Sequence, residues 1–325
     1  MLLSFVIPCY HSAATLPEVV EEIKTTVERD GRYDYEIILV NDNPPDDTYE
    51  VIRGLAGKDR HVRGICMTRN FGQHAALMAG YREVRGEIVI SLDDDGQTPA
   101  DQVFRLVDAL REDVDVVYAR YPSKKHSMFR NFGTYMNEKM AVWLLGKPEN
   151  LHITSYFAMR PVVVRQIVQY HNPYSYVEGL VLRATSRVID VPVEHRAREC
   201  GESGYTFSKL LSLWLNGFTA FSVKPLRVGS LVGTVLMILG FLSAVVVLVQ
   251  KLWLGDAIDA GWSSLMCLLL VLGGLILAML GLLGEYIGRI YVSISAAPQY
   301  VIRERCGEDE TEEKMSGIRC RISEK

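Results

Sequence analysis

The strongest constraint on how this chain can fold is a pair of long, uncharged apolar runs in its C-terminal third. Neither the run 228–250 nor the run 260–284 contains a charged residue. Each is longer than the roughly 20 residues that a helix needs to cross the hydrocarbon core of a bilayer. Buried helices of a soluble core are shorter and carry a polar face, so they are the weaker interpretation. The pattern predicts a membrane-spanning hairpin with its turn at 251–259.

The charges beside these runs predict which way the hairpin is oriented. Lys224 and Arg227 precede the first run, and Arg289, Arg303 and Arg305 follow the second. Basic residues that flank spans favour the cytoplasmic side, so both ends of the hairpin should be cytoplasmic. No cleavable signal sequence opens the chain, and the 6 cysteines have no C-x-x-C spacing. We therefore expect the N-terminal part to lie in the reducing cytosol.

Residues 2 to 120 alternate between short apolar runs and amphipathic stretches. The runs 36–40 and 88–92 are typical of strands, and the stretches 16–28 and 100–111 of helices. Near-continuous apolar strands between helices indicate a parallel sheet that is covered on both faces. The sequence therefore predicts an α/β, Rossmann-like domain whose ligands bind beyond the carboxyl ends of the strands.

An acidic run follows one of the predicted strands. Asp93, Asp94 and Asp95 come directly after the strand 88–92, and Gln97 follows two positions later. Carboxylate and amide oxygens are the ligands that Mg²⁺ takes while it bridges to substrate phosphates. Such a run is often only a solvated turn, but this strand is apolar and should end in the ligand crevice. The run is therefore a candidate metal site.

Polar residues also follow two other predicted strands. Asp42 is predicted to accept hydrogen bonds from a nucleotide base or ribose, although a turn residue is the alternative. The segment 69–74 leads into a helix and should approach a donor diphosphate or ribose, because helix N-termini attract anions. A purely structural role is an equal alternative for His74. The polar members of this segment are Arg69, Asn70, Gln73 and His74, and Gly72 lies at the turn.

Between 121 and 227 the pattern is less regular and more basic. Arginine forks bind phosphate bidentately, so Arg120, Arg130 and Arg198 suit an anionic lipid headgroup. Thr134 lies one turn after Arg130 and adds a hydroxyl, whereas a solvated basic face is the alternative for each arginine. The amphipathic stretches 128–144 and 206–223 are predicted to lie on the membrane surface, or else to pack on the sheet. The charged residues beyond 303 predict a mobile or oligomer-forming tail.

In combination, these motifs resemble the inverting family-2 (GT-A fold) polyprenyl-phosphate glycosyltransferases, which include bacterial undecaprenyl-phosphate sugar transferases. The resemblance covers nearly the whole chain. The chain departs from the family pattern at His11-Ser12, where Asn-Glu is usual, and at Asn43-Pro44, where Gly-Ser is usual. The matching residues are Pro8-x-Tyr10, Asp42, 69–80, Asp93-x-Asp95-x-Gln97, 201–203 and 283–291.

The resemblance implies four parts: a cytosolic GT-A catalytic domain (1–205), an interfacial helix (206–227), a transmembrane hairpin (228–290) and a cytosolic tail (291–325). It also implies a homotetramer. Mg²⁺ or Mn²⁺ would be held by Asp93, Asp95 and Gln97, and the acceptor phosphate by Arg130, Thr134 and Arg198. The basic pattern adds Arg120 to the expected phosphate contacts. The implied catalytic residues are Asp93, Asp94, Asp95 and Arg198, and the nucleotide-sugar contacts are Pro8, Tyr10, Asp42, Arg69, Asn70, Gly72, His74 and Asp94.

The expected reaction is transfer of a sugar from a nucleotide diphosphate, with UDP favoured by analogy, to undecaprenyl phosphate for cell-envelope glycan or for lipid A or O-antigen modification. Two other classes of protein remain open. A processive polysaccharide synthase would need more spans and a Gln-x-x-Arg-Trp signature, which is missing. A non-catalytic scaffold that binds nucleotide sugars would not need the acidic run together with the arginines. The net charge of −4 gives no indication of nucleic-acid binding.

Overall fold

The chain divides into two compact units in the computed structural model. One comprises Met1–Gly204 and Ala297–Lys325, and the other Tyr205–Ala296. The segment that follows the predicted hairpin thus belongs to the same unit as the N-terminal residues. The structure describes residues 1–121, 142, 147–194, 226, 229–236, 238–239, 242, 249, 253, 262–295 and 297–307.

The first unit is built around a mixed sheet of 8 described strands in the order β7-β5-β6-β4-β1-β2-β3-β8. Strands β1, β2, β3 and β4 run parallel, as do β5 and β7. Strand β6 is antiparallel to both of its neighbours, and β8 is antiparallel to β3. The strands are β1 (Leu2–Cys9), β2 (Asp34–Asn41), β3 (Val62–Met67), β4 (Ile88–Ser91), β5 (Val116–Arg120), β6 (Phe157–Met159), β7 (Val188–Pro192) and β8 (Ile302–Cys306).

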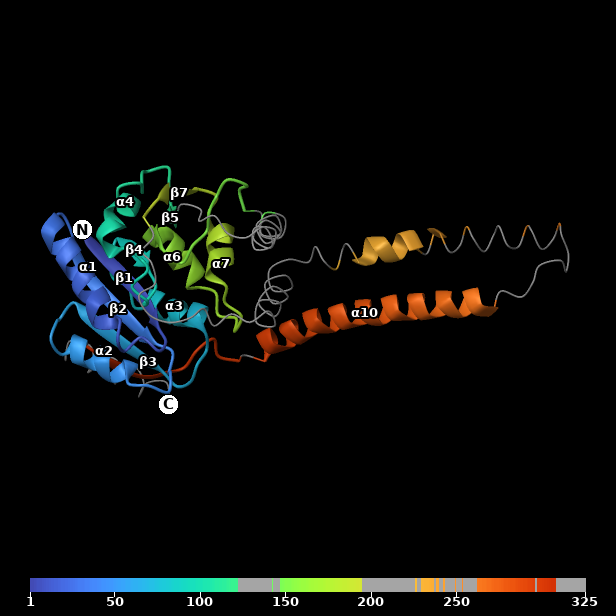
Figure 1. The fold of residues 1–325 in the computed structure, drawn as a ribbon, viewed down its shortest axis with the longest axis horizontal. Helices are drawn as coiled ribbons and strands as arrows, with labels where there is room; N and C mark the ends of the chain where they lie inside the picture. Colours follow the sequence, from blue (N-terminus) through green and yellow to red (C-terminus); the bar gives the residue numbers. More distant parts are fainter. Residues whose placement is uncertain are drawn as a thin grey trace, which may run out of the picture. The chain divides into compact units, whose positions relative to one another are not determined.

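Helices cover both faces of this sheet (Figure 1). Side chains alternate across each strand, so Phe5 and Ile7 of β1 join the core on one face, and Val6 joins the core on the other. The first core includes α1 (Leu16–Asp30), α2 (Thr48–Ala56), η1 (Ala100–Gln102) and α4 (Val103–Val107), and the second includes α3 (Gln73–Tyr81), α6 (Pro161–Ile167) and α7 (Val177–Ala184).

The predicted α/β alternation is present and the predicted strands β1 to β4 are parallel, but antiparallel β6 and β8, which were not predicted, make the whole sheet mixed. Strand β6 has only 3 residues, too few to carry a periodic signal. Strand β8 has three consecutive charged residues, Arg303 to Arg305, and lies where the charge of the sequence predicted a mobile or oligomer-forming tail. Ion pairs from Glu304 to Arg53 and from Arg305 to Glu83 offset its charges, so this part of the tail forms the sheet edge.

A buried polar network crosses the middle of the sheet. The guanidinium of Arg63 on β3 donates to Glu36 on β2 at 2.6 Å, and the Ser4 hydroxyl on β1 donates to the same carboxylate at 2.5 Å. The backbone N–H of Arg85 donates to Glu36 at 2.6 Å. Because the pair is hydrogen-bonded on several sides, its burial is tolerated.

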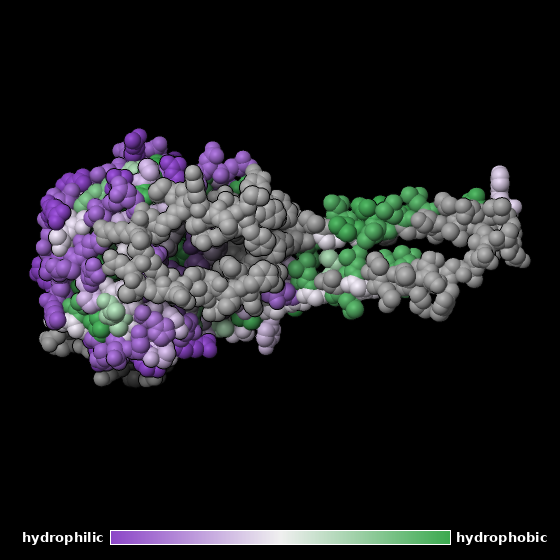
Figure 2. All heavy atoms as spheres, viewed as in Figure 1, coloured by the Kyte–Doolittle hydropathy of each residue, from purple (hydrophilic) through white to green (hydrophobic). Residues whose placement is uncertain are grey.

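The second unit contains α10 (Trp262–Ile294), which extends beyond the predicted end of the second span at 284. Within it, Leu272–Ile294 is long and apolar enough to cross a bilayer, with a mean hydropathy of 1.6. It is the one such helix among the described residues. The described parts of the first predicted span include the helical stretch 229–236, where Gly229 closely approaches Met279 of α10. Figure 2 shows hydrophobic residues crowding along the described parts of this hairpin.

Candidate active site

The carboxyl ends of three neighbouring parallel strands bring the predicted polar residues to one edge of the sheet. In the strand register, Cys9 of β1 pairs with Asn41 of β2, and Val6 of β1 pairs with Ser91 of β4. Tyr10 and Asp42 come directly after β1 and β2, and Asp93 follows β4 after one intervening residue. This is the edge at which open α/β sheets bind ligands.

Asp93 is half-buried and held from two sides. The Ser155 hydroxyl donates to its Oδ2 atom, and Gln73 Nε2 donates to its Oδ1 atom at 3.1 Å. Burial is the main reason why the pKa of Asp93 is raised to about 6; the bond from Ser155 opposes this, and the charges of Asp95 and Asp94 add to it. The acidic run therefore concentrates negative charge in a place that is poorly solvated.

The two other carboxylates of the run have different surroundings. Asp94 accepts the Tyr10 backbone N–H at 2.9 Å, and its carbonyl accepts the Thr15 hydroxyl at 2.6 Å. Burial raises the pKa of Asp94, while the bond from Tyr10 lowers it. Asp95 accepts the backbone N–H of Gln97 at 3.0 Å across a tight turn. Asp94 is thus tied to the end of β1, while Asp95 and Gln97 lie together.

Asp42 organises the loop that leads into α3. Its side chain is buried, and its two oxygens accept the backbone N–H groups of Phe71 at 2.7 Å and of Gly72 at 2.8 Å. Burial raises the pKa of Asp42, and these two bonds lower it. Gly72 has φ +91° and ψ 157°, a conformation that is open essentially to glycine alone. The backbone N–H groups just before α3, which could have bound a ligand, are therefore hydrogen-bonded to Asp42. The contact of Asp42 with a nucleotide stays a prediction.

The other predicted nucleotide-sugar residues lie at the same edge or next to it. Tyr10 is 47% exposed, whereas Pro8 is buried within β1. The Arg69 guanidinium lies 4.7 Å from the centroid of the Phe71 ring, and Asn70 is exposed. Exposed aromatic and amide groups at this edge are compatible with a bound nucleotide.

His74 faces α7 and not the acidic run. Its Nδ1 atom lies 3.6 Å from Glu178 Oε2, and its ring meets that of Tyr176 edge-on at 5.1 Å. The Val177 backbone N–H donates to His74 Nδ1 at 3.5 Å. These contacts join the start of α3 to the start of α7, which agrees with the structural alternative for His74.

Of the predicted phosphate-binding residues, only Arg120 is described. It is exposed at the end of β5, with its guanidinium 3.7 Å from Asp190 on β7. Arg130, Thr134 and Arg198 lie outside the described residues, as do most of the two predicted interfacial stretches. The proximity of these residues to Arg120 therefore stays a prediction.

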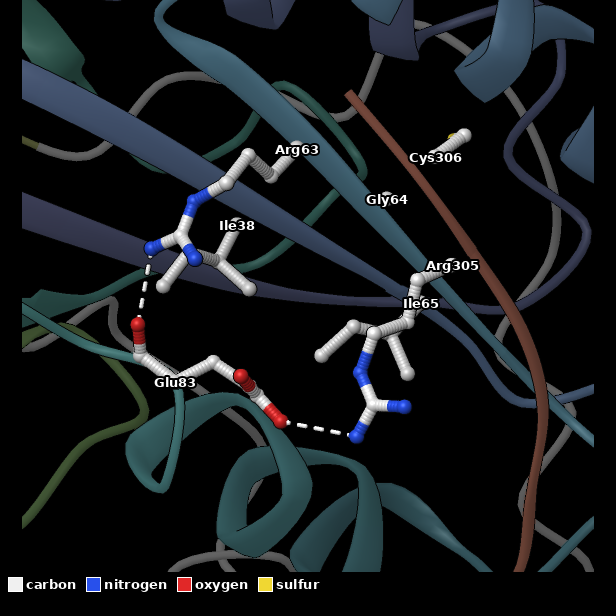
Figure 3. A pocket seen from close by; sticks show the side chains of 7 residues that line it. All are labelled: Ile38, Arg63, Gly64, Ile65, Glu83, Arg305 and Cys306. Carbon is white, nitrogen blue, oxygen red and sulfur yellow. Dashed lines mark hydrogen bonds and ion pairs between the residues drawn. The ribbon is translucent and has the colours of Figure 1, made fainter. Parts of the chain in front are cut away.

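No cluster of three or more His, Cys, Asp or Glu residues arranged to hold a metal is found within the described part of the chain. The described hollow at the sheet edge, lined by Arg63, Glu83 and Arg305 among others, contains none of the predicted site residues (Figure 3). It lies between β3 and β8 and not at the strand ends.

The segment 154–157 stands out in the sequence only because it lacks an acidic residue that some relatives of the family carry, so the contact of Ser155 with Asp93 was not predicted. Gln73 appeared only as part of a motif. Because β6 is antiparallel to β4, with Ser91 paired to Phe157, continuing the register by two residues brings Asp93 opposite Ser155. No local pattern signals this pairing. Tyr121 was also missed; burial and the nearby charge of Asp93 raise its pKa to about 12.

The fold of the first unit has a counterpart among solved structures. A solved structure of mannosyl-3-phosphoglycerate synthase from Rubrobacter xylanophilus matches with a TM-score of 0.50 at 17% identity, over 70% of this chain and 74% of that one. The family profile described as Glycosyl transferase family 2 matches residues 4–166. Together they define a glycosyltransferase with the GT-A fold.

More specifically, the chain belongs to glycosyltransferase family 2 and carries a hairpin like that of GtrB. The profile described as GtrB C-terminal hairpin matches residues 224–290. A Photorhabdus laumondii protein named undecaprenyl-phosphate 4-deoxy-4-formamido-L-arabinose transferase is 34% identical over 314 residues, covering 96% of each chain. A Proteus mirabilis protein of the same name is 35% identical over 308 residues, covering 94% of each.

Proposed function

We propose that this glycosyltransferase moves a sugar from a nucleotide-diphosphate donor, a UDP-sugar, to undecaprenyl phosphate at the cytoplasmic face of the inner membrane. The observation that carries the proposal is the half-buried acidic run at the ligand-binding edge of a family-2 domain whose chain continues into a membrane hairpin. The names of the two full-length relatives support undecaprenyl phosphate as the acceptor.

Mg²⁺ or Mn²⁺ is the cofactor that these residues suit. Asp93 and Asp95 offer carboxylates and Gln97 an amide oxygen, which are the hard oxygen ligands that these cations take. Burial and the neighbouring carboxylates raise the pKa of Asp93, so a cation would offset charge that the protein leaves poorly compensated. When bound, the cation would stabilise the negative charge that develops on the leaving diphosphate.

The chemistry requires alignment more than proton transfer. The acceptor phosphate is already ionised near neutral pH, so one of its oxygens can attack the anomeric carbon without a strong base. The bond from that carbon to the donor diphosphate breaks, the electron pair leaves with UDP, and attack from the opposite face inverts the configuration. The Asp42-bound loop and the Tyr10–Asp94 contact would hold the donor in place for this attack.

The proposal also covers the acceptor-binding residues, the oligomeric state and the membrane topology of the protein. Arg120, Arg130, Thr134 and Arg198 bind the acceptor phosphate, and Asp94 touches the donor sugar. The protein is a multi-pass homotetramer with its catalytic unit in the cytoplasm, and its product serves cell-envelope glycan or lipid modification. The roles of Arg130, Thr134 and Arg198 and the homotetramer follow from the family resemblance, while the role of Arg120 rests on its basic segment and the two spans on hydropathy. Substitution tests the residues, and mass measurement in detergent tests the oligomer.

The test is a transfer assay on the full chain in detergent, with undecaprenyl phosphate, Mg²⁺ or Mn²⁺, and a panel of UDP- and GDP-sugars. We expect lipid-dependent nucleotide release with one donor and its loss on addition of EDTA. Asp95→Asn should lower the rate by about 100-fold or more, the usual effect of removing one preorganised electrostatic group. Asp113→Asn makes the same charge change in an exposed turn and should keep full activity.

The outcomes separate the proposal from its rivals. Release that needs the lipid, and that Asp95→Asn abolishes, supports the transferase. Donor binding without any lipid-dependent release, from every member of the panel, would favour the scaffold. Formation of a polymer in the absence of undecaprenyl phosphate would point to a processive synthase.

A further inference from the structure

The residues that follow α10 are hydrogen-bonded to the C-terminal end of α3. Arg82 caps the C-terminus of that helix, and its Nη1 atom donates to the Tyr300 hydroxyl at 2.8 Å. Its Nη2 atom donates to Gln299 Oε1 at 3.4 Å and to the Tyr170 carbonyl at 3.3 Å. Gln299 is 5% exposed and donates to the Asn172 carbonyl at 3.0 Å. A half-buried network thus joins the residues after α10 to α3 and to the loop before α7.

The same segment is hydrogen-bonded to Thr68, the residue that follows β3. The Thr68 backbone N–H donates to the Val301 carbonyl at 2.9 Å, and the Arg303 guanidinium donates to the Thr68 carbonyl at 3.3 Å. That carbonyl also accepts Asn43 Nδ2 at 3.4 Å, from the turn after β2. We call residues 297–303 the post-hairpin strap, since they follow α10 and contact both places.

Between these two attachments lies the part of the chain that contacts the acidic edge. Residues 68–82 hold Gly72, whose N–H binds Asp42, and Gln73, whose amide binds Asp93. The strap contacts this loop and helix at their first residue, Thr68, and their last, Arg82. Displacing either end would move both contacts at the acidic edge, because a short helix transmits such a shift as a rigid rod.

We infer that the post-hairpin strap is a positioning element for the donor site, with Tyr300, Gln299 and Arg303 as its positioning residues. The inference rests on the proposed function for the identity of the donor site. The strap is joined covalently to α10, so it also links the membrane hairpin to the donor-binding loop through the chain. None of its residues needs to touch substrate.

Strand β8 provides a control for general edge-strand stability. Glu304 pairs with Arg53 on α2 at 3.0 Å, so within the described residues its side chain bonds to α2 and not to 68–82. Arg305 in contrast pairs with Glu83, the residue after Arg82, so it belongs with the strap contacts (Figure 3). Glu304→Gln therefore weakens the docking of the same strand without loosening the donor-side loop.

The experiment compares Tyr300→Phe, Arg82→Gln and Arg82→Lys with Glu304→Gln in the full chain, in detergent with undecaprenyl phosphate. Loss of a hydrogen bond to a charged group should raise the donor KM about five- to tenfold in Tyr300→Phe and Arg82→Gln. The lipid KM should stay within twofold of wild type, and Arg82→Lys should recover part of the loss. Hydrogen exchange of 69–81 should accelerate in Tyr300→Phe and not in Glu304→Gln.

Two results would overturn the inference. One is an unchanged donor KM and unchanged exchange of 69–81 in Tyr300→Phe, a variant that loses one hydroxyl and should fold. The other is an equal effect in Glu304→Gln, which would make the strap a general stabiliser of the sheet edge. If wild type transfers no sugar, the proposed function fails, and the exchange measurement still decides whether the strap controls 69–81.

Discussion

Replacing Ser155 by Ala should shift the pH range in which the acidic run binds a cation. Burial is the main cause that raises the pKa of Asp93 to about 6, and the hydrogen bond from Ser155 holds it down. A hydrogen bond to a charged group contributes about 1.5–3 kcal/mol, or about one to two pKa units. Asp93 is half-buried and keeps Gln73 as a partner, so we take the lower end, about one unit.

The direction of the change in cation affinity with pH follows from competition between the cation and a proton for Asp93. Ionised Asp93 binds the cation, so affinity is full above its pKa and falls about tenfold per pH unit below it. In wild type the fall should begin near pH 6, and in Ser155→Ala about one unit higher. At pH 6.5 the variant should bind Mn²⁺ about threefold more weakly than wild type, and at pH 8 almost equally well.

The assay is Mn²⁺ binding to the full chain in detergent without donor, by calorimetry or by electron paramagnetic resonance, from pH 5 to 8. Thr154→Val is the matched control, because the Thr154 hydroxyl donates to the backbone carbonyls of Ala119 and Tyr156 and not to a carboxylate. A midpoint that stays at its wild-type pH in Ser155→Ala would refute the reasoning. So would an equal shift in the control.

Two further predictions concern positions where the backbone or a buried charge is constrained. Gly72→Ala, at φ +91°, should cost about 1–3 kcal/mol of folding free energy and raise the donor KM, because it disturbs the N–H group that binds Asp42. Thermal unfolding and kinetics measure both effects, and Gly54→Ala, in an open helical position, should not destabilise. Glu36→Gln leaves buried Arg63 without its charge partner and should cost about 3–5 kcal/mol, measured by denaturant unfolding. Glu50→Gln removes the partner of an exposed pair and should change stability by less than about 1 kcal/mol, so equal losses in the two glutamine variants would contradict the argument.

Much of the first unit could be predicted from local pattern. The buried strands β1 and β2 and the amphipathic helix α1 carry the period of their own structure, so each is visible without its neighbours. Helix α1 has Pro17 in its first turn and is capped at its C-terminus by Gly31 with φ +68°, and both are local signals in the sequence. The predicted helix at 100–111 is wrong in extent, since a 3₁₀ turn leads into an α4 that ends at Val107.

The acidic edge was predicted in part for a similar reason. Parallel strands end at a common edge, so residues such as Asp42 and Asp93 can be placed there once the strands are recognised. What each side chain contacts could not be predicted. The pairing of Asp42 with the 71–72 backbone depends on how the loop after β3 folds back, and no spacing rule describes that.

By itself, the sequence determined the apolar C-terminal hairpin, the alternation of strands and helices, and the acidic run at a strand end. These features depend on neighbours in the chain, since hydropathy and periodicity are local properties. Only the tertiary structure decided that Ser155 meets Asp93 and that the post-hairpin strap holds Thr68 and Arg82. Such contacts join residues far apart in the chain, and they exist because antiparallel β6 and β8 pack in one particular register, which local patterns do not encode.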